Sequence, residues 1–133
     1  GRMDNVRVLG PTREATQIEL SATDAFALGL NAPVRVSGDL ERAASCVLIG
    51  PNGEVKTRAS VIIPARHLHC NETHARRLGL THHQLVTLAG PDGSGPFTHV
   101  TVRVHPTFAL EFHVTADEAA EHWLQTGDTL CLT

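Results

Sequence analysis

The sequence is poor in aromatic side chains, with no tyrosine, one tryptophan and four phenylalanines among 133 residues. It has no apolar run near the roughly 20 residues that cross a bilayer, and no basic start followed by an apolar stretch. We therefore expect neither a membrane span nor a signal peptide. A net charge of −3 offers no basic face for nucleic acid. With 41% hydrophobic and 19% charged residues, the chain is expected to fold, either as one compact domain or as two small barrels.

Cysteine is scarce and shows no paired spacing. The three cysteines, Cys46, Cys70 and Cys131, form no CxxC motif. This pattern predicts a reduced, intracellular chain in which the cysteines are small buried hydrophobic residues. The sequence also has no glycine-rich phosphate loop, no nucleophile elbow and no Ser-His-Asp arrangement, so no covalent nucleophile is recognisable.

Histidine is in excess, with nine residues, which indicates that imidazoles serve in chemistry. His67 and His69 share one face of a strand, because residues i and i+2 do so. Two neutral imidazoles on one face can hold a metal ion such as zinc. Exposed or core-packed histidines are the alternative. Six further histidines show no common spacing and are expected on the surface or on helices: His74, His82, His83, His99, His105 and His122.

Short β-branched stretches separated by turns dominate the chain. Turn residues lie at 10–11, 50–53 and 90–93, and the last two turns stand in similar sequence surroundings. Many short strands with few short helices predict a mainly β fold of small β-barrels capped by short α-helices, and not a βαβ sheet. The expected strands cover residues 6–9, 34–36, 47–49, 61–63, 85–88 and 100–104.

One local unit occurs three times: a strand end, a metal-competent residue, and then the N-cap of a short helix. Thr115 and Glu118 fit a capping box, and Gly29 and Gly79 suit helix C-termini. The three pairs of metal-competent and capping residues are Glu19 with Ser21, His69 with Asn71, and His113 with Thr115.

Strand periodicity places two polar groups on one side of each of these strand ends. The alternate residues Ile18, Leu68 and Phe112 are apolar and are expected to face a barrel interior. The polar pairs are Gln17 with Glu19, His67 with His69, and Glu111 with His113. If the strand ends converge, they supply a plausible zinc set with an open position for substrate, formed by Glu19, His67, His69 and His113.

Four other residues attract attention. Arg13 lies in the turn before the first strand end and is a candidate phosphate ligand through its planar guanidinium, with a solvated loop arginine as the alternative. Arg66 directly precedes the histidine pair and points to the opposite face. Cys70 also alternates away from the histidines and is expected in the core. Trp123 is expected to pack in a core or between barrels.

Five stretches of the sequence resemble the PduL-type phosphotransacylases, which are phosphate propanoyltransferases. The resemblance runs over essentially the whole chain, and its motifs are long and follow the order of that family. They are NVRVLGPTR at residues 5–13, TQIELS at 16–21, VSGDL at 36–40, IIPARHLH at 62–69 and FALEFH at 108–113.

The resemblance implies an enzyme that interconverts an acyl-CoA, propanoyl-CoA or acetyl-CoA, and phosphate with acyl phosphate and CoA. The reaction would proceed by metal-assisted attack of phosphate on the thioester, with no covalent enzyme intermediate. The resemblance also implies two β-barrels capped by short helices, with two zinc ions at the barrel junction. Residues 1–64 would be a portion of the first barrel and residues 65–133 a portion of the second.

The resemblance assigns roles to five residues of this chain. By motif match, His67, His69 and His113 would hold one zinc ion, and Glu19 would belong to the other. Arg13 would bind the phosphate substrate.

The sequence departs from the family in one respect. The family has another histidine-x-histidine toward its N-terminus, whereas this sequence has that motif only at His67. One zinc site would therefore be incomplete in this chain, and association with an upstream segment is implied. Open barrel edges would favour pairing with another chain. The resemblance further implies a homodimer and a cytoplasmic location, with a bacterial microcompartment and its shell as an open alternative.

Two other functions stay open at this point. The same ligands could serve a zinc-dependent hydrolase, which would act on the thioester without phosphate. The chain could instead be a non-catalytic metal-binding or interaction module with structural histidines. No sequence motif indicates the preferred acyl chain length or the residues that bind CoA.

Overall fold

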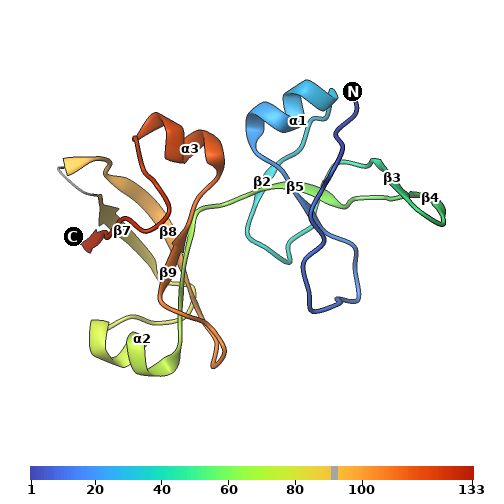
Figure 1. Cartoon of the computed structure of the whole chain (residues 1–133). Helices are drawn as coiled ribbons and strands as arrows, with labels where there is room; N and C mark the ends of the chain where they lie inside the picture. The colour runs from blue at the N-terminus through green and yellow to red at the C-terminus, as the bar shows by residue number, and fades with distance from the viewer. Residues whose placement is uncertain (91–92) are drawn as a thin grey trace. The chain divides into compact units, whose positions relative to one another are not determined.

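The computed structural model describes residues 1–90 and 93–133 and divides into two compact units, Gly1–Pro64 and Ala65–Thr133 (Figure 1). Both are built mainly from short strands, and their helices are short, so the mainly β class is confirmed. No helix in the described part of the chain is long and apolar enough to span a membrane. The expected turn at residues 90–93 includes positions 91 and 92, which lie outside the described residues.

The first unit contains one three-stranded sheet and one hairpin. The sheet has the order β1-β5-β2, and both outer strands run parallel to β5. The hairpin pairs β3 with β4, and Gly50 stands opposite Gly53 across the expected turn. The elements are β1 (Ile18–Glu19), α1 (Ala22–Leu28), β2 (Val34–Arg35), β3 (Val47–Gly50), β4 (Gly53–Lys56) and β5 (Val61–Pro64).

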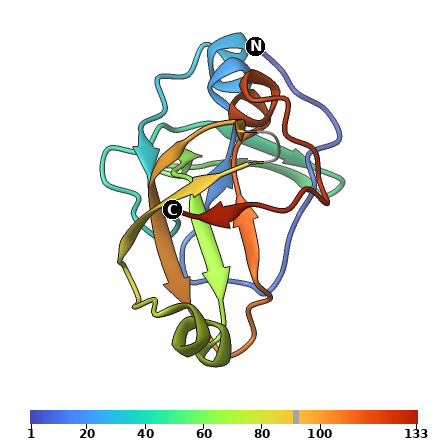
Figure 2. The ribbon, with the colours of Figure 1, turned by 90° about the vertical axis from the view of Figure 1, so that its left-hand side faces the viewer.

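The second unit is organised around a five-stranded sheet with the order β10-β7-β8-β6-β9. Strand β6 runs parallel to β8, and the other pairs are antiparallel. Helices α2 and α3 lie at opposite ends of this sheet (Figure 2). The elements are β6 (His67–Cys70), α2 (Glu72–Leu78), β7 (Leu85–Ala89), β8 (Phe97–Val104), β9 (Glu111–His113), α3 (Ala116–Glu121) and β10 (Cys131–Leu132).

Each unit has its own hydrophobic core, and the alternation expected for the three strand ends holds in both. Leu68 belongs to the core of the second unit, and Phe112 packs against that core. Ile18 packs against the smaller core of the first unit. Cys70 is fully buried, as expected. The polar residues that alternate with these apolar ones therefore lie on the other face of their strands.

The helix caps follow the sequence. Ser21, Asn71 and Thr115 occupy the N-cap positions of α1, α2 and α3, and each side chain accepts a hydrogen bond from a backbone N–H of the first turn. Gly29 and Gly79 end α1 and α2 in the left-handed conformation, with φ of 74° and 67°. These caps fix where each helix begins after its strand.

Several expectations are wrong. Residues 6–9 form no strand: Val8 is 93% exposed, and the segment pairs with no strand among the described residues. A β-branched pattern does not make a strand where no partner satisfies its backbone. Trp123 is 91% exposed and lies outside the core of its unit, and Cys131 is exposed. The alternative position of Trp123 between barrels stays a prediction. Strand β4 was missed because its residues are charged and glycine-containing, and only the hairpin pairing makes it a strand. Two closed barrels and a metal site at their junction stay predictions.

Candidate metal centre

Three histidines meet on one face of the five-stranded sheet. His67 and His69 lie on β6, and the antiparallel register places His67 directly opposite His113 on β9. The next pair on the same face joins His69 to Glu111. The HxH spacing and the neighbouring strand therefore bring together three of the four residues expected to bind metal.

The imidazole rings are close enough to share one ion. The ring centroids of His67 and His113 are 5.0 Å apart, those of His69 and His113 4.5 Å, and those of His67 and His69 4.7 Å. One nitrogen from each ring lies within 4.8 Å of the others. Within residues 1–90 and 93–133, these three histidines are the group of possible metal ligands whose donor atoms lie this close together.

A backbone hydrogen bond sets the tautomer of His67. Its Nδ1 lies 2.9 Å from the carbonyl oxygen of Ala65, and His67 is buried. Because a carbonyl oxygen only accepts, Nδ1 donates, and the lone pair of the neutral ring is then on Nε2. Histidines that bind metals commonly donate their other ring N–H to a carbonyl or carboxylate in this way. The hydrogen bond therefore presents Nε2 of His67 as the ligand atom.

His69 is held by an aromatic stack. The Phe108 ring lies 3.8 Å from it between centroids, with an angle of 16° between the planes. A turn positions Phe108: its N–H donates to the carbonyl of His105, whose own N–H donates to the carbonyl of Cys70 at the end of β6. The loop that carries Phe108 is thus tied to the strand that carries His69.

Burial, and after it the nearby His67, His113 and Arg103 in that order, together lower the pKa of His69 to about 4. A histidine with such a pKa is neutral near pH 7. A neutral imidazole has the lone pair that a metal ion needs, so no proton must leave His69 on binding.

His113 is the most accessible member of the cluster, with 42% of its side chain exposed. Its Nε2 lies 3.4 Å from Oε2 of Glu111, whose side chain is 62% exposed. The sequence placed Glu111 and His113 on one face but did not single out Glu111 as a candidate. In the structure, Glu111 places a carboxylate beside the His113 imidazole of the cluster.

Arg13 and Glu19, the other two expected site residues, belong to the first unit and are exposed. Nη1 of Arg13 donates to Oγ of Ser37 at 3.2 Å. Nε2 of Gln17 donates to Oε1 of Glu19 at 2.7 Å and to the same Ser37 hydroxyl at 2.8 Å. Oε1 of Gln17 accepts from the N–H of Gly38 at 2.8 Å. One network therefore links the arginine to the carboxylate within this unit, and their participation in the histidine site stays a prediction.

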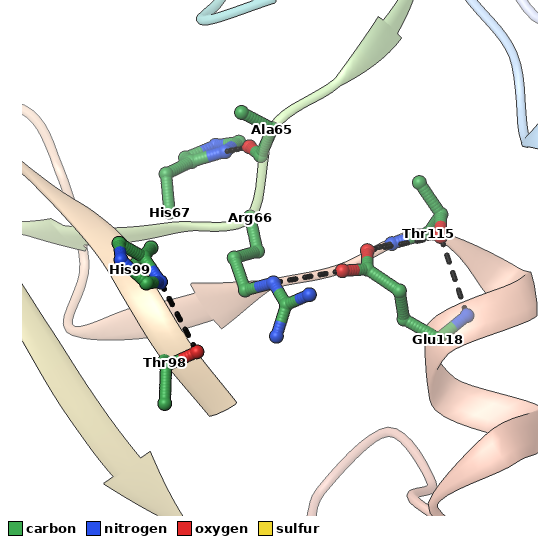
Figure 3. A network of polar contacts seen from close by, with 7 residues as sticks. All are labelled: Ala65, Arg66, His67, Thr98, His99, Thr115 and Glu118. Atoms are coloured by element: carbon green, nitrogen blue, oxygen red, sulfur yellow. Dashed lines mark hydrogen bonds and ion pairs between the residues drawn. The ribbon is translucent and has the colours of Figure 1, made fainter. Parts of the chain in front are cut away.

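Arg66 forms an ion pair within the second unit. Its Nε lies 2.9 Å from Oε1 of Glu118 at the start of α3 (Figure 3). The sequence identified Glu118 as a capping residue and left Arg66 ambiguous, because pairing between distant segments leaves no local pattern. Phe108 was missed for the same reason, although its place in an aromatic-poor sequence was a usable indication.

The donor set fits a transition-metal ion. Three imidazoles, one with a defined tautomer and one neutral, form a cluster that could hold a metal, and such a set leaves a coordination position for a further ligand. Nothing in the cluster identifies the metal as zinc, because copper, iron and nickel also accept imidazole. The cluster can act chemically as a site for a bound Lewis acid.

Comparison with known proteins places this chain in a family. Residues 1–125 match the family model described as phosphate propanoyltransferase. The chain is 47% identical over 130 residues to the phosphate propanoyltransferase of Thermotoga maritima, covering 96% of this chain and 62% of the relative. It is 43% identical over 122 residues to that of Citrobacter rodentium, and 40% identical over 121 residues to that of Salmonella typhimurium. Each of these two matches covers 90% of this chain and 58% of the relative.

The chain therefore spans about three fifths of the length of these relatives. The match nevertheless includes every element from β1 to α3, and with them the three clustered histidines. From the sequence motifs, the shared length and the degree of identity, it follows that this chain belongs to the phosphate propanoyltransferase family.

Proposed function

We propose that this chain carries a metal site of a phosphate acyltransferase, which interconverts a short-chain acyl-CoA and phosphate with acyl phosphate and CoA. The observation that supports this most strongly is the three-histidine cluster on β6 and β9, in a chain that belongs to the phosphate propanoyltransferase family. Propanoyl-CoA is the substrate that the names of the relatives favour.

In this proposal His67, His69 and His113 would hold a zinc ion, and that ion would supply Lewis-acid chemistry at the thioester carbonyl and its developing negative charge. The hydrogen bond from Nδ1 of His67 to Ala65 fixes the direction of one ligand. The stack on Phe108 fixes the plane of a second. These restraints lower the conformational entropy that the histidines lose when they bind the ion.

Arg13 binds and orients the phosphate substrate. Its contact with Ser37 restrains one guanidinium nitrogen, and the side chain is exposed, so the planar group remains accessible for charge-assisted hydrogen bonds to phosphate. Glu19 would supply a carboxylate ligand to a second zinc ion. We include in this proposal two barrels that meet near Pro64, with the metal site at their junction.

The reaction is a direct transfer. A phosphate oxygen attacks the thioester carbonyl carbon, a C–O bond forms, and the C–S bond breaks with its electron pair leaving on the CoA sulfur. Cys70 does not act as an intermediate acyl carrier, because it is fully buried and burial raises the pKa of its thiol. CoA thiolate is an adequate leaving group, so the site needs no strong general acid.

The test is to incubate the zinc-loaded chain with propanoyl-CoA and to measure free CoA thiol and acyl phosphate, with and without phosphate. The proposal predicts that CoA release requires phosphate and matches acyl phosphate formation. CoA release without phosphate would identify a hydrolase instead. Bound zinc with no turnover in either condition would identify a metal-binding module.

A further inference from the structure

His113, the third histidine of the cluster, lies on a short strand at the edge of the sheet. Strand β9 is three residues long and lies at the edge of the sheet, where it pairs with β6. Short edge strands lose their pairing easily, because they are hydrogen-bonded on one side only. The position of His113 opposite His67 therefore depends on what holds the ends of β9.

A side-chain bridge joins the end of β9 to the start of β6 (Figure 3). Nε of Arg66 pairs with Oε1 of Glu118 at 2.9 Å. The other oxygen of Glu118, Oε2, accepts hydrogen bonds from the N–H and the hydroxyl of Thr115, both at 3.0 Å. The Glu118 carboxylate thus pairs with Arg66 through one oxygen and accepts hydrogen bonds from Thr115 through the other.

The ends of this bridge lie beside the two facing histidines in the sequence. Arg66 directly precedes His67, and Thr115 follows His113 by two residues. The carbonyl of Arg66 also accepts a hydrogen bond from the N–H of Thr101 at 3.2 Å, which fixes its backbone to β8. The bridge therefore connects a backbone anchored in the middle of the sheet to the exit of the edge strand.

The ion pair is better shielded than a typical surface pair. The side chain of Arg66 is 32% exposed and that of Glu118 is 23% exposed. Partial burial reduces the solvent screening of the ion pair. The capping box also holds the second oxygen of Glu118, so the carboxylate is oriented toward Arg66 independently of the ion pair.

We propose that the Arg66–Glu118 ion pair is a positioning element of the metal site, which holds His113 opposite His67 before the ion binds. This inference rests on the proposed function, because it takes the three histidines to be metal ligands. Partners outside the ligand shell of a metal site commonly change affinity by about 10- to 100-fold when they are removed.

Two variants separate this role from the capping of α3. Arg66→Met removes the ion pair and leaves the Thr115–Glu118 capping box intact. Glu118→Gln keeps a side chain that suits a capping box but loses the charge that pairs with Arg66. The matched control is Arg77→Met, which removes an exposed arginine from α2, at the other end of the sheet from α3.

The experiment titrates the whole 133-residue chain with Co²⁺ at neutral pH and follows visible absorption, which reports both the affinity and the coordination geometry. We expect Arg66→Met and Glu118→Gln each to weaken Co²⁺ binding by roughly 10- to 100-fold, and Arg77→Met to leave it unchanged. The double variant should bind Co²⁺ as tightly as the single variant with the lower affinity, because both substitutions remove the same ion pair. Arg66→Lys, which retains the charge, should bind more tightly than Arg66→Met.

Circular dichroism of each metal-free variant shows whether it is folded at the titration temperature. A lower melting temperature with unchanged Co²⁺ affinity and spectrum would show a merely structural ion pair and overturn the proposal. If Arg66→Met fails to fold, Glu118→Gln decides, since a Co²⁺ affinity equal to that of the parent chain in this variant would also overturn the proposal. A parent chain that binds no Co²⁺ would overturn the metal site itself and the positioning role with it.

Discussion

Acidification of the metal-free protein tests the environment of His69. Burial, with the neighbouring His67, His113 and Arg103, lowers the pKa of this imidazole from 6.5 to about 4. His69 should therefore stay neutral well below the pH at which an exposed histidine gains a proton. The fold favours the neutral ring, and the unfolded chain, whose His69 has an ordinary pKa, binds the proton more readily.

The sign and the size of the effect follow from this difference. The stabilisation from His69 is fully present above pH 6.5 and is lost as the pH falls toward about 4, because protons bind preferentially to the unfolded chain in that window. The difference between a pKa of 6.5 and one of about 4 corresponds to about 3.4 kcal/mol of unfolding free energy as an upper bound. Because His69 is half-buried, we expect the measured loss to be smaller than this bound.

The assay is a titration of the imidazole resonances by NMR, with Phe108→Ala as the perturbation. Removing the stacked ring admits water to His69, so its pKa should rise toward 6.5 and the loss of stability on acidification should shrink. Phe26→Ala is the matched control, since Phe26 is 84% exposed on α1. A His69 midpoint near 6.5 in the parent chain would refute the reasoning.

Three further predictions concern the helix caps, the buried thiol and the phosphate site. Gly79→Ala should lower the unfolding free energy by about 1 kcal/mol in urea denaturation, because φ is +67° at this C-cap; Gly10→Ala, where a Cβ meets no atom within 4 Å, is the control. Cys70→Ala should retain turnover, and loss of activity with intact zinc content would indicate an acyl-cysteine route. Arg13→Ala should raise the KM for phosphate far more than it alters zinc content; an unchanged KM would remove Arg13 from the site.

Local patterns predicted the parts of this site that depend on one segment alone. The i, i+2 spacing placed His67 with His69 and Glu111 with His113, and the N-cap at Thr115 followed from the capping box. The apolar residues that alternate with them lie against the cores as expected. These inferences succeed because strand alternation and helix capping are determined within a few residues.

Local patterns did not predict how distant segments pair, and the meeting of His67 and His69 with His113 was expected only if the strand ends converge and from the family resemblance. The register that sets His67 opposite His113 is fixed by the packing of β9 on β6, and neither strand codes for it alone. The ion pair between Arg66 and Glu118 and the stack of Phe108 on His69 are likewise tertiary contacts. Conversely, residues 6–9 have a strand pattern without a pairing partner in the described part of the chain, and the pattern failed there.

The most direct measurement for the whole account is the metal content of the purified chain after zinc loading and removal of excess ion. The account predicts roughly one zinc per chain held by the three clustered imidazoles, and its loss in His113→Ala and His69→Ala. His99→Ala, which removes an exposed histidine outside the cluster, should keep the zinc. A parent chain without zinc, or a full zinc content in both cluster variants, would contradict the account.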